Sequence, residues 1–149
     1  MSHITKINLL VKDLDAMEKA CSRLGLELVR DKKTFKWFGR FVGDSPGIAG
    51  MDAKDYGKCE HAIRVKGNAN AYEIGLVKRV DGKGYDLHWD SWCRGYGLLD
   101  KVCYTQQQTG AEKLKDWYAA EVARKQMSKQ GFRVQMTQQD GKVQVLCRK

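Results

Sequence analysis

Two Asp-Gly turns, each lying between alternating apolar and polar residues, constrain the fold of this chain most strongly. The first, Asp81-Gly82-Lys83-Gly84, separates YEIGLVKRV (72–80) from YDLHWD (85–90). The second, Asp140-Gly141, separates FRVQM (132–136) from KVQVL (142–146). Asp-Gly between two alternating segments is typical of a tight turn that joins neighbouring antiparallel strands. The sequence therefore predicts two antiparallel hairpins.

Apolar residues at helical spacing occur in two other segments. Asp13 can cap a helix in which Leu14, Met17, Cys21 and Leu24 share one face, and Gly25 favours its end. Residues 111–130 predict a longer helix that stops before Gly131. Further strands are predicted at 4–12, 26–30, 34–42 and 62–66, with a long irregular loop at 43–57. This order predicts a single α+β domain over residues 1–149, a mostly antiparallel sheet with two helices packed on one face.

The charge of the chain points to a class of partner. Lys and Arg outnumber Asp and Glu by 27 to 18, a net charge of +9. Residues 101–149 hold ten of these cations and four of the acids, so +6 of the charge lies in the last third. A chain this basic attracts polyanions without a shaped pocket.

The segment TFKWFGRF (34–41) interleaves aromatic and basic residues, the combination with which single-stranded nucleic acid is bound. Strict strand alternation gives another interpretation, in which Phe35, Trp37 and Phe41 are core and the cations face solvent. Near the end of the predicted long helix, Arg124, Lys125 and Lys129 belong either to a phosphate track or to a solvated helix end. The candidate nucleic-acid-binding residues are Lys32, Lys33, Lys36, Trp37, Arg40, Arg124, Lys125, Arg148 and Lys149.

Catalytic and metal-binding motifs are weak by comparison. Asp86, His88 and Asp90 would share one strand face with Cys93 nearby, which suits a metal or a thiol-imidazole pair. The polar face of an amphipathic hairpin has the same pattern, and no second group of ligands supports the metal. We therefore expect no catalytic residues, no metal and no cofactor.

The chain has five cysteines, an odd number, and they are widely spaced in the sequence. This spacing favours reduced thiols and a cytoplasmic protein, with Cys21 and Cys147 buried as small apolar side chains. No apolar run is as long as a membrane span, and the N-terminus does not resemble a signal peptide. We expect no membrane partner.

Several motifs resemble an uncharacterised family of cyanobacterial, chloroplast and phage proteins, a hypothetical chloroplast reading frame of unknown function. The opening MSHITKI is similar to the MSHFTxI start of that family, and KDLDAMEKACSRLGLEL matches its first strand and helix. NAYEIGLVKRVDGKGYDLHWDSW and KQGFRVQMTQQDGKVQVLCRK resemble its central and last hairpins. The resemblance covers most of the chain apart from about residues 34–58. It implies a fold and a phage or bacterial origin, and it supplies no catalytic residues.

The expected function is that of a small basic non-enzymatic protein that contacts nucleic acid, with RNA or single strands favoured, mainly through phosphates. A basic surface can also bind an acidic protein, so an interaction adaptor is an alternative. A capture protein for small anionic nucleotides is a third, and it would need a closed pocket.

Overall fold

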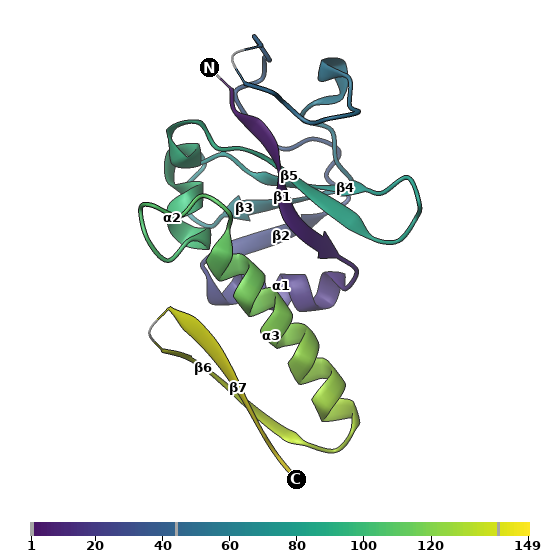
Figure 1. The fold of residues 1–149 in the computed structure, drawn as a ribbon, viewed down its shortest axis with the longest axis vertical. Helices are drawn as coiled ribbons and strands as arrows, with labels where there is room; N and C mark the ends of the chain where they lie inside the picture. The colour runs from purple at the N-terminus through teal and green to yellow at the C-terminus, as the bar shows by residue number, and fades with distance from the viewer. Residues whose placement is uncertain (1, 44, 140) are drawn as a thin grey trace.

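The computed structural model describes residues 2–43, 45–139 and 141–149, and its largest element is a five-stranded sheet (Figure 1). The elements are β1 (Ile4–Val11), α1 (Leu14–Arg23), β2 (Leu26–Arg30), β3 (His61–Val65), β4 (Ile74–Lys78), β5 (Tyr85–Asp90), α2 (Leu98–Val102), α3 (Glu112–Lys129), β6 (Arg133–Gln139) and β7 (Lys142–Arg148). Short 3-10 turns lie at Ala53–Asp55 and Trp92–Gly97.

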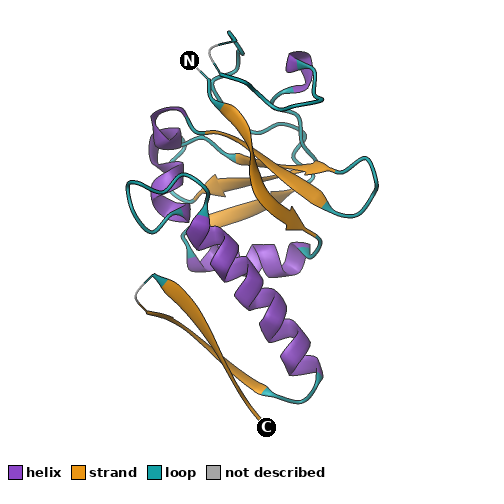
Figure 2. Ribbon diagram, viewed as in Figure 1, coloured by secondary structure: helices purple, strands orange, loops and turns teal. Residues whose placement is uncertain are grey.

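The sheet has the strand order β1-β5-β4-β3-β2, and every neighbouring pair is antiparallel (Figure 2). The predicted hairpin around Asp81-Gly82 is confirmed as β4 and β5. The two edge strands, β1 and β2, are joined by α1. This helix begins where the sequence predicts, because the Asp13 carboxylate accepts a hydrogen bond of 3.0 Å from the Ala16 N–H.

The main core lies between the sheet and two helices, α1 and α3. Leu76, Leu87 and Trp89 of the sheet pack in one apolar cluster with Met17 of α1 and Leu114 of α3. The hydroxyl of Tyr118 on α3 accepts hydrogen bonds from the N–H groups of Lys12 and Asp13, at 3.1 and 3.2 Å. These bonds tie α3 to the turn between β1 and α1. The predicted α+β class with a mostly antiparallel sheet is confirmed, and both predicted helices pack in this cluster. The short helix α2, which was not predicted, packs there as well through Leu98, Leu99 and Val102.

The opposite face of the sheet is covered by the irregular segment that connects β2 to β3. Phe35, Ile48 and Tyr56 from this segment form a second cluster with Ile4 and Ala62 of the sheet. The predicted strand at 34–42 is wrong, since only Thr34 forms an isolated bridge, with Lys58. Gly39 and Gly43 have positive φ angles of 93° and 79°, which interrupt an extended conformation. The rest of this segment is irregular apart from Ala53–Asp55, as predicted, and Asp44 lies outside the described residues.

The second predicted hairpin is confirmed as β6 and β7, which pair with each other and not with the large sheet. Met136, Val143 and Val145 pack toward α3, on the side of the helix away from the sheet (Figure 1). The Trp117 Nε1 on α3 also donates to Gln138 Oε1, at 3.3 Å. Asp140, in the predicted turn, lies outside the described residues.

All five cysteines are free, and their burial differs. Cys21 is buried as predicted, and this burial raises the pKa of its thiol to about 12. The prediction for Cys147 is wrong, because it is exposed near the end of β7. It shares the α3-facing side of the hairpin with Val145 but lies farther toward the open end. Within the described parts of the chain, no helix has the length and apolar character to cross a bilayer.

Candidate nucleic-acid interface

The aromatic side chains of residues 34–41 are used mainly for packing. Phe35 is buried over Gly75 of β4, which supports the core interpretation for this residue although the segment is not a strand. Trp37 is half-buried and meets the ring of Tyr56 edge-on, with centroids 6.2 Å apart, and Phe41 contacts the same ring at 5.1 Å. Phe38, at 39% exposure, is the most open of the four. A continuous platform for stacking bases is therefore not present along this segment.

Most cations of this region have partners within the protein. Lys32 forms an ion pair with Glu73 at 2.6 Å, and Lys33 forms one with Glu60 at 3.3 Å. The Lys36 ammonium donates to the Ala69 carbonyl at 2.6 Å. Arg40 is exposed and has no partner among the described residues. The first predicted cluster thus offers one unpaired cation to a ligand.

The predicted cations on α3 are also paired. Arg124 contacts Glu121 at 3.0 Å, and the other oxygen of the same buried carboxylate accepts from Arg23 at 2.8 Å. Lys125 reaches Asp13 at 2.9 Å. Together with the Ala16 N–H, whose hydrogen bond has the larger effect, Lys125 lowers the pKa of the Asp13 carboxyl below its ordinary value. These pairs attach α3 to α1 across a sequence distance that no local pattern covers.

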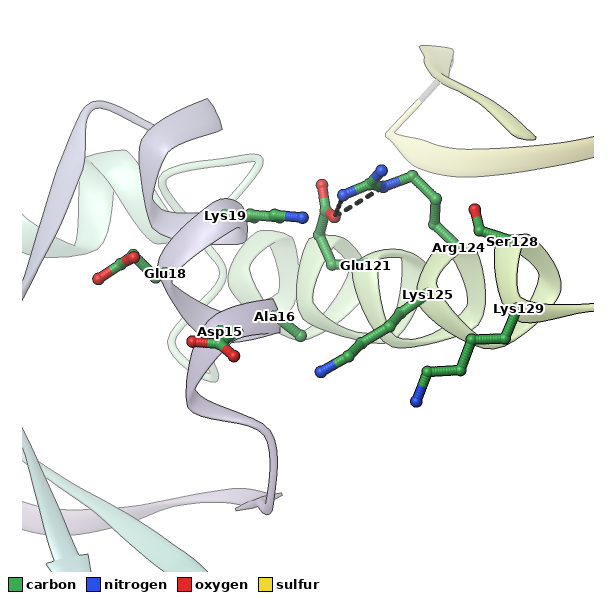
Figure 3. A pocket seen from close by; sticks show the side chains of 9 residues that line it. All are labelled: Asp15, Ala16, Glu18, Lys19, Glu121, Arg124, Lys125, Ser128 and Lys129. Atoms are coloured by element: carbon green, nitrogen blue, oxygen red, sulfur yellow. Dashed lines mark hydrogen bonds and ion pairs between the residues drawn. The ribbon is translucent and has the colours of Figure 1, made fainter. Parts of the chain in front are cut away.

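A pocket of about 530 Å³ lies between α1 and α3 beside these pairs (Figure 3). Lys19, Ser128 and Lys129 line it with Arg124 and Lys125, but so do three carboxylates, Asp15, Glu18 and Glu121. Figure 3 shows the ion pair between Glu121 and Arg124 within this lining. Carboxylates beside the cations weaken the attraction for an anion, so the pocket is poorly suited to a nucleotide phosphate.

The C-terminal hairpin also presents unpaired positive charge, and none of its described residues is acidic. Residues 122–149 contain seven cations and one acid, Asp140, a net charge of +6. Among the residues that the structure describes, Lys129, Arg133, Lys142 and Arg148 have no ion-pair partner, and all four are exposed. The ammonium of Lys149 lies 5.3 Å from the Phe132 ring centroid. This set, residues 129–149, is the strongest candidate for contact with a polyanion.

The structure does not bring the predicted residues into one surface. Phe35 and its neighbours cover one face of the sheet, whereas α3 and the hairpin belong to the other face. Successive residues of a strand point to opposite faces, which assigns the two apolar clusters to opposite sides. Lys32, Lys33, Lys36, Trp37 and Arg40 are therefore separated from Arg124, Lys125, Arg148 and Lys149 by the sheet.

The polar residues of β5 share a face, as the sequence predicts, and each has its own environment. The Asp90 carboxylate accepts from the backbone N–H groups of His3, Phe38 and Trp92, at 2.9, 3.1 and 3.0 Å. Asp86 pairs with Arg79 at 3.1 Å.

His88 lies between Asp86 and Asp90 in the sequence. Its side chain is buried, and its Nδ1 has no hydrogen-bond partner. Burial lowers its pKa to about 4. No hydrogen bond joins it to the exposed Cys93. No group of three or more potential metal ligands occurs in the described part of the chain.

Sequence reasoning missed the turn at Trp92–Gly97, which follows β5. Its residues Cys93–Tyr96 all have φ between 50° and 61°, a left-handed conformation that side chains disfavour. Arg94 holds the turn by donating to the carbonyls of Gln106 and Gln108, at 2.9 and 3.1 Å, and to Asp100. Tyr96 is left 48% exposed. In the sequence, Gly95 and Gly97 are the residues that indicate an unusual backbone at this turn.

Arg133 and Lys142 were not among the binding residues predicted from the sequence. The signal that identifies them is the absence of any acid except Asp140 after Glu121.

Comparison of the chain with family models, with curated proteins and with solved structures finds no match.

Proposed function

We propose that this protein is a small non-enzymatic binding protein that contacts nucleic acid mainly through phosphates. The observation that carries the proposal is the set of unpaired, exposed cations in residues 129–149. Cations that are paired within the protein must lose their acidic partner before they bind phosphate. Unpaired cations need only displace the counterions that are condensed on the nucleic acid. The C-terminal hairpin is therefore the primary contact surface.

The expected preference for RNA or single strands depended on stacking by residues 34–41. Phe35, Trp37 and Phe41 are occupied by packing, which removes most of that support. Phe38 and Tyr96 remain as exposed aromatic side chains for a secondary contact. We place the protein in the cytoplasm, that of the host if a phage encodes it, because a compartment that keeps thiols reduced suits five free cysteines.

The test is a salt series of fluorescence anisotropy with labelled DNA and RNA. With four to six phosphates neutralised, affinity should fall on the order of a hundredfold to a thousandfold between about 50 and 200 mM salt. The double variant R133Q/R148Q should weaken binding and reduce the slope of log affinity against log salt by about 2.

A matched control keeps the same change in net charge. Lys54 and Lys101 are exposed, have no acidic ion-pair partner among the described residues, and lie outside the hairpin. K54Q/K101Q should therefore retain most of the affinity. Equal losses in the two variants would show that only net charge matters. No binding at low salt would refute the proposal, and binding of polyglutamate as tight as that of nucleic acid would favour the adaptor.

A further inference from the structure

The outward side of the C-terminal hairpin has a composition unlike that of its packed side. Because Met136, Val143 and Val145 face α3, the alternate residues of both strands point away from the protein. All of these are exposed, and we call them the ribbon face: Arg133, Gln135, Thr137, Gln139, Lys142, Gln144, Leu146 and Arg148.

Charge is distributed along the ribbon face in a definite order. Arg133 lies directly opposite Arg148 at the open end, and Gln139 lies opposite Lys142 near the turn. Between them are two uncharged cross-strand pairs, Gln135 with Leu146 and Thr137 with Gln144. No residue of the ribbon face is acidic.

The pairing of Arg133 with Arg148 does not help the hairpin fold. Like charges directly opposite each other across an antiparallel pair destabilise it, and neither guanidinium has an acidic partner among the described residues. A bound polyanion would remove this repulsion. The placement of these two arginines therefore favours a ligand that carries a row of negative charges.

The shape of the hairpin limits which nucleic acid can use the uncharged pairs. The major groove of B-form DNA is about 12 Å wide and admits a two-stranded ribbon, whereas that of A-form RNA is too deep and narrow to be read. In that groove Gln pairs with adenine, Arg with guanine, and Thr or Leu contacts the thymine methyl group. The hairpin projects from the protein beyond α3, which leaves this side open (Figure 2).

We propose that the ribbon face enters the major groove of double-stranded DNA and reads base edges. Gln135, Thr137 and Gln144 supply the base contacts, while the cations at its two ends bind phosphates or guanine at the margins. α3 supports the hairpin from behind through Val143, Val145 and the bond from Trp117 to Gln138. This inference depends on the proposed function and adds to it the class of nucleic acid and a preference for sequence.

The experiment begins with selection from a pool of random-sequence DNA duplexes by the full chain. We expect enrichment of a short motif, bound at least tenfold more tightly than a scrambled duplex at the same salt concentration. The same sequence as single-stranded DNA or as duplex RNA should bind no better than the scrambled duplex. Methylation of guanine N7, which blocks the major groove, should interfere with binding.

The variant Q135A/Q144A should lose most of the preference for the selected motif, while its affinity for the scrambled duplex and its salt dependence stay unchanged. The control Q107A/Q126A removes two exposed glutamines outside the hairpin and should keep the preference. Thermal unfolding of each variant confirms that the fold is retained.

The results that would overturn the inference differ from those that would refute the proposed function. Absence of binding to every nucleic acid would refute both. Salt-dependent binding without an enriched motif, or with equal affinity for single strands, would leave the proposed function and overturn the duplex reading. A preference that survives Q135A/Q144A, or that is insensitive to N7 methylation, would also overturn it.

Discussion

The ring of Phe35 packs directly onto Gly75 of β4, in the space that a β-carbon at position 75 would occupy. This contact attaches the irregular segment between β2 and β3 to the face of the sheet that the helices leave uncovered. Phe35 is buried with Ile48 and Tyr56, and Gly75 pairs with His88 in the middle of the sheet. The glycine therefore fixes where the segment lies.

A methyl group at position 75 should displace Phe35, so we expect Gly75→Ala to destabilise the protein by about 1 to 3 kcal/mol through overpacking. Phe35→Ala should cost about 3 to 5 kcal/mol, because it empties a buried site. Phe38→Ala is the matched control with little effect, since Phe38 is largely open. Urea unfolding of the three variants measures these differences. Additive losses in the double variant of Phe35 and Gly75 would contradict direct packing.

A second prediction concerns the carboxylate of Asp90, which accepts from three backbone N–H groups, those of His3 and Phe38 in segments distant in sequence and that of the nearby Trp92. Asp90→Ala would leave these donors without an acceptor in a buried site, at a cost of about 3 kcal/mol or more. Asp90→Asn keeps one side-chain oxygen and should cost less. The comparison is with Asp86→Ala, whose partners are the partly exposed Lys6 and Arg79.

Thermal unfolding of the Asp90 and Asp86 variants measures this difference. Hydrogen exchange should also show faster exchange of the Phe38 and Trp92 amides in Asp90→Ala. Equal stability of the Asp90 and Asp86 variants would show that the three hydrogen bonds do not hold these segments in place.

The local features of the fold could be predicted from sequence because they depend on neighbours in the chain. Asp13 caps α1 through a residue three positions ahead, and the turn at Asp81-Gly82 joins strands that pair with each other. The alternation of apolar and polar residues in 132–136 and 142–146 likewise predicts that one side of the hairpin packs and the other side is exposed. Periodicity and turn chemistry are sufficient for such elements.

The candidate site could be predicted only in part, because charge neutralisation depends on contacts between distant segments. Lys125 and Asp13 are 112 positions apart, and Lys32 and Glu73 are 41 positions apart. No local pattern shows that these cations are already paired. Contacts between distant segments also explain why residues 34–41 do not form the predicted strand. Phe35 packs against β4, and the Phe38 N–H donates to Asp90, so the alternation expected of a strand does not apply.

The final prediction concerns His88, which lies on β5 across from Lys6 and Gly75. Burial lowers its pKa from 6.5 to about 4, against an opposing effect of Asp86 and with a smaller contribution from Lys6. The unfolded chain therefore takes up a proton below about pH 6.5, while the folded protein does so only near pH 4. Stability from this group is complete above pH 6.5 and is lost as the pH falls toward 4, a change of about 3 kcal/mol.

The measurement is urea unfolding of the wild type and His88→Gln at several pH values between 4 and 7. Glutamine stays neutral, so the stability of the variant should depend less on pH over this interval, and the stability gap between the proteins should change by about 3 kcal/mol. The carboxylates are common to both proteins and cancel in the comparison. A gap that does not change with pH would show that His88 is protonated in the folded protein as readily as in the unfolded chain.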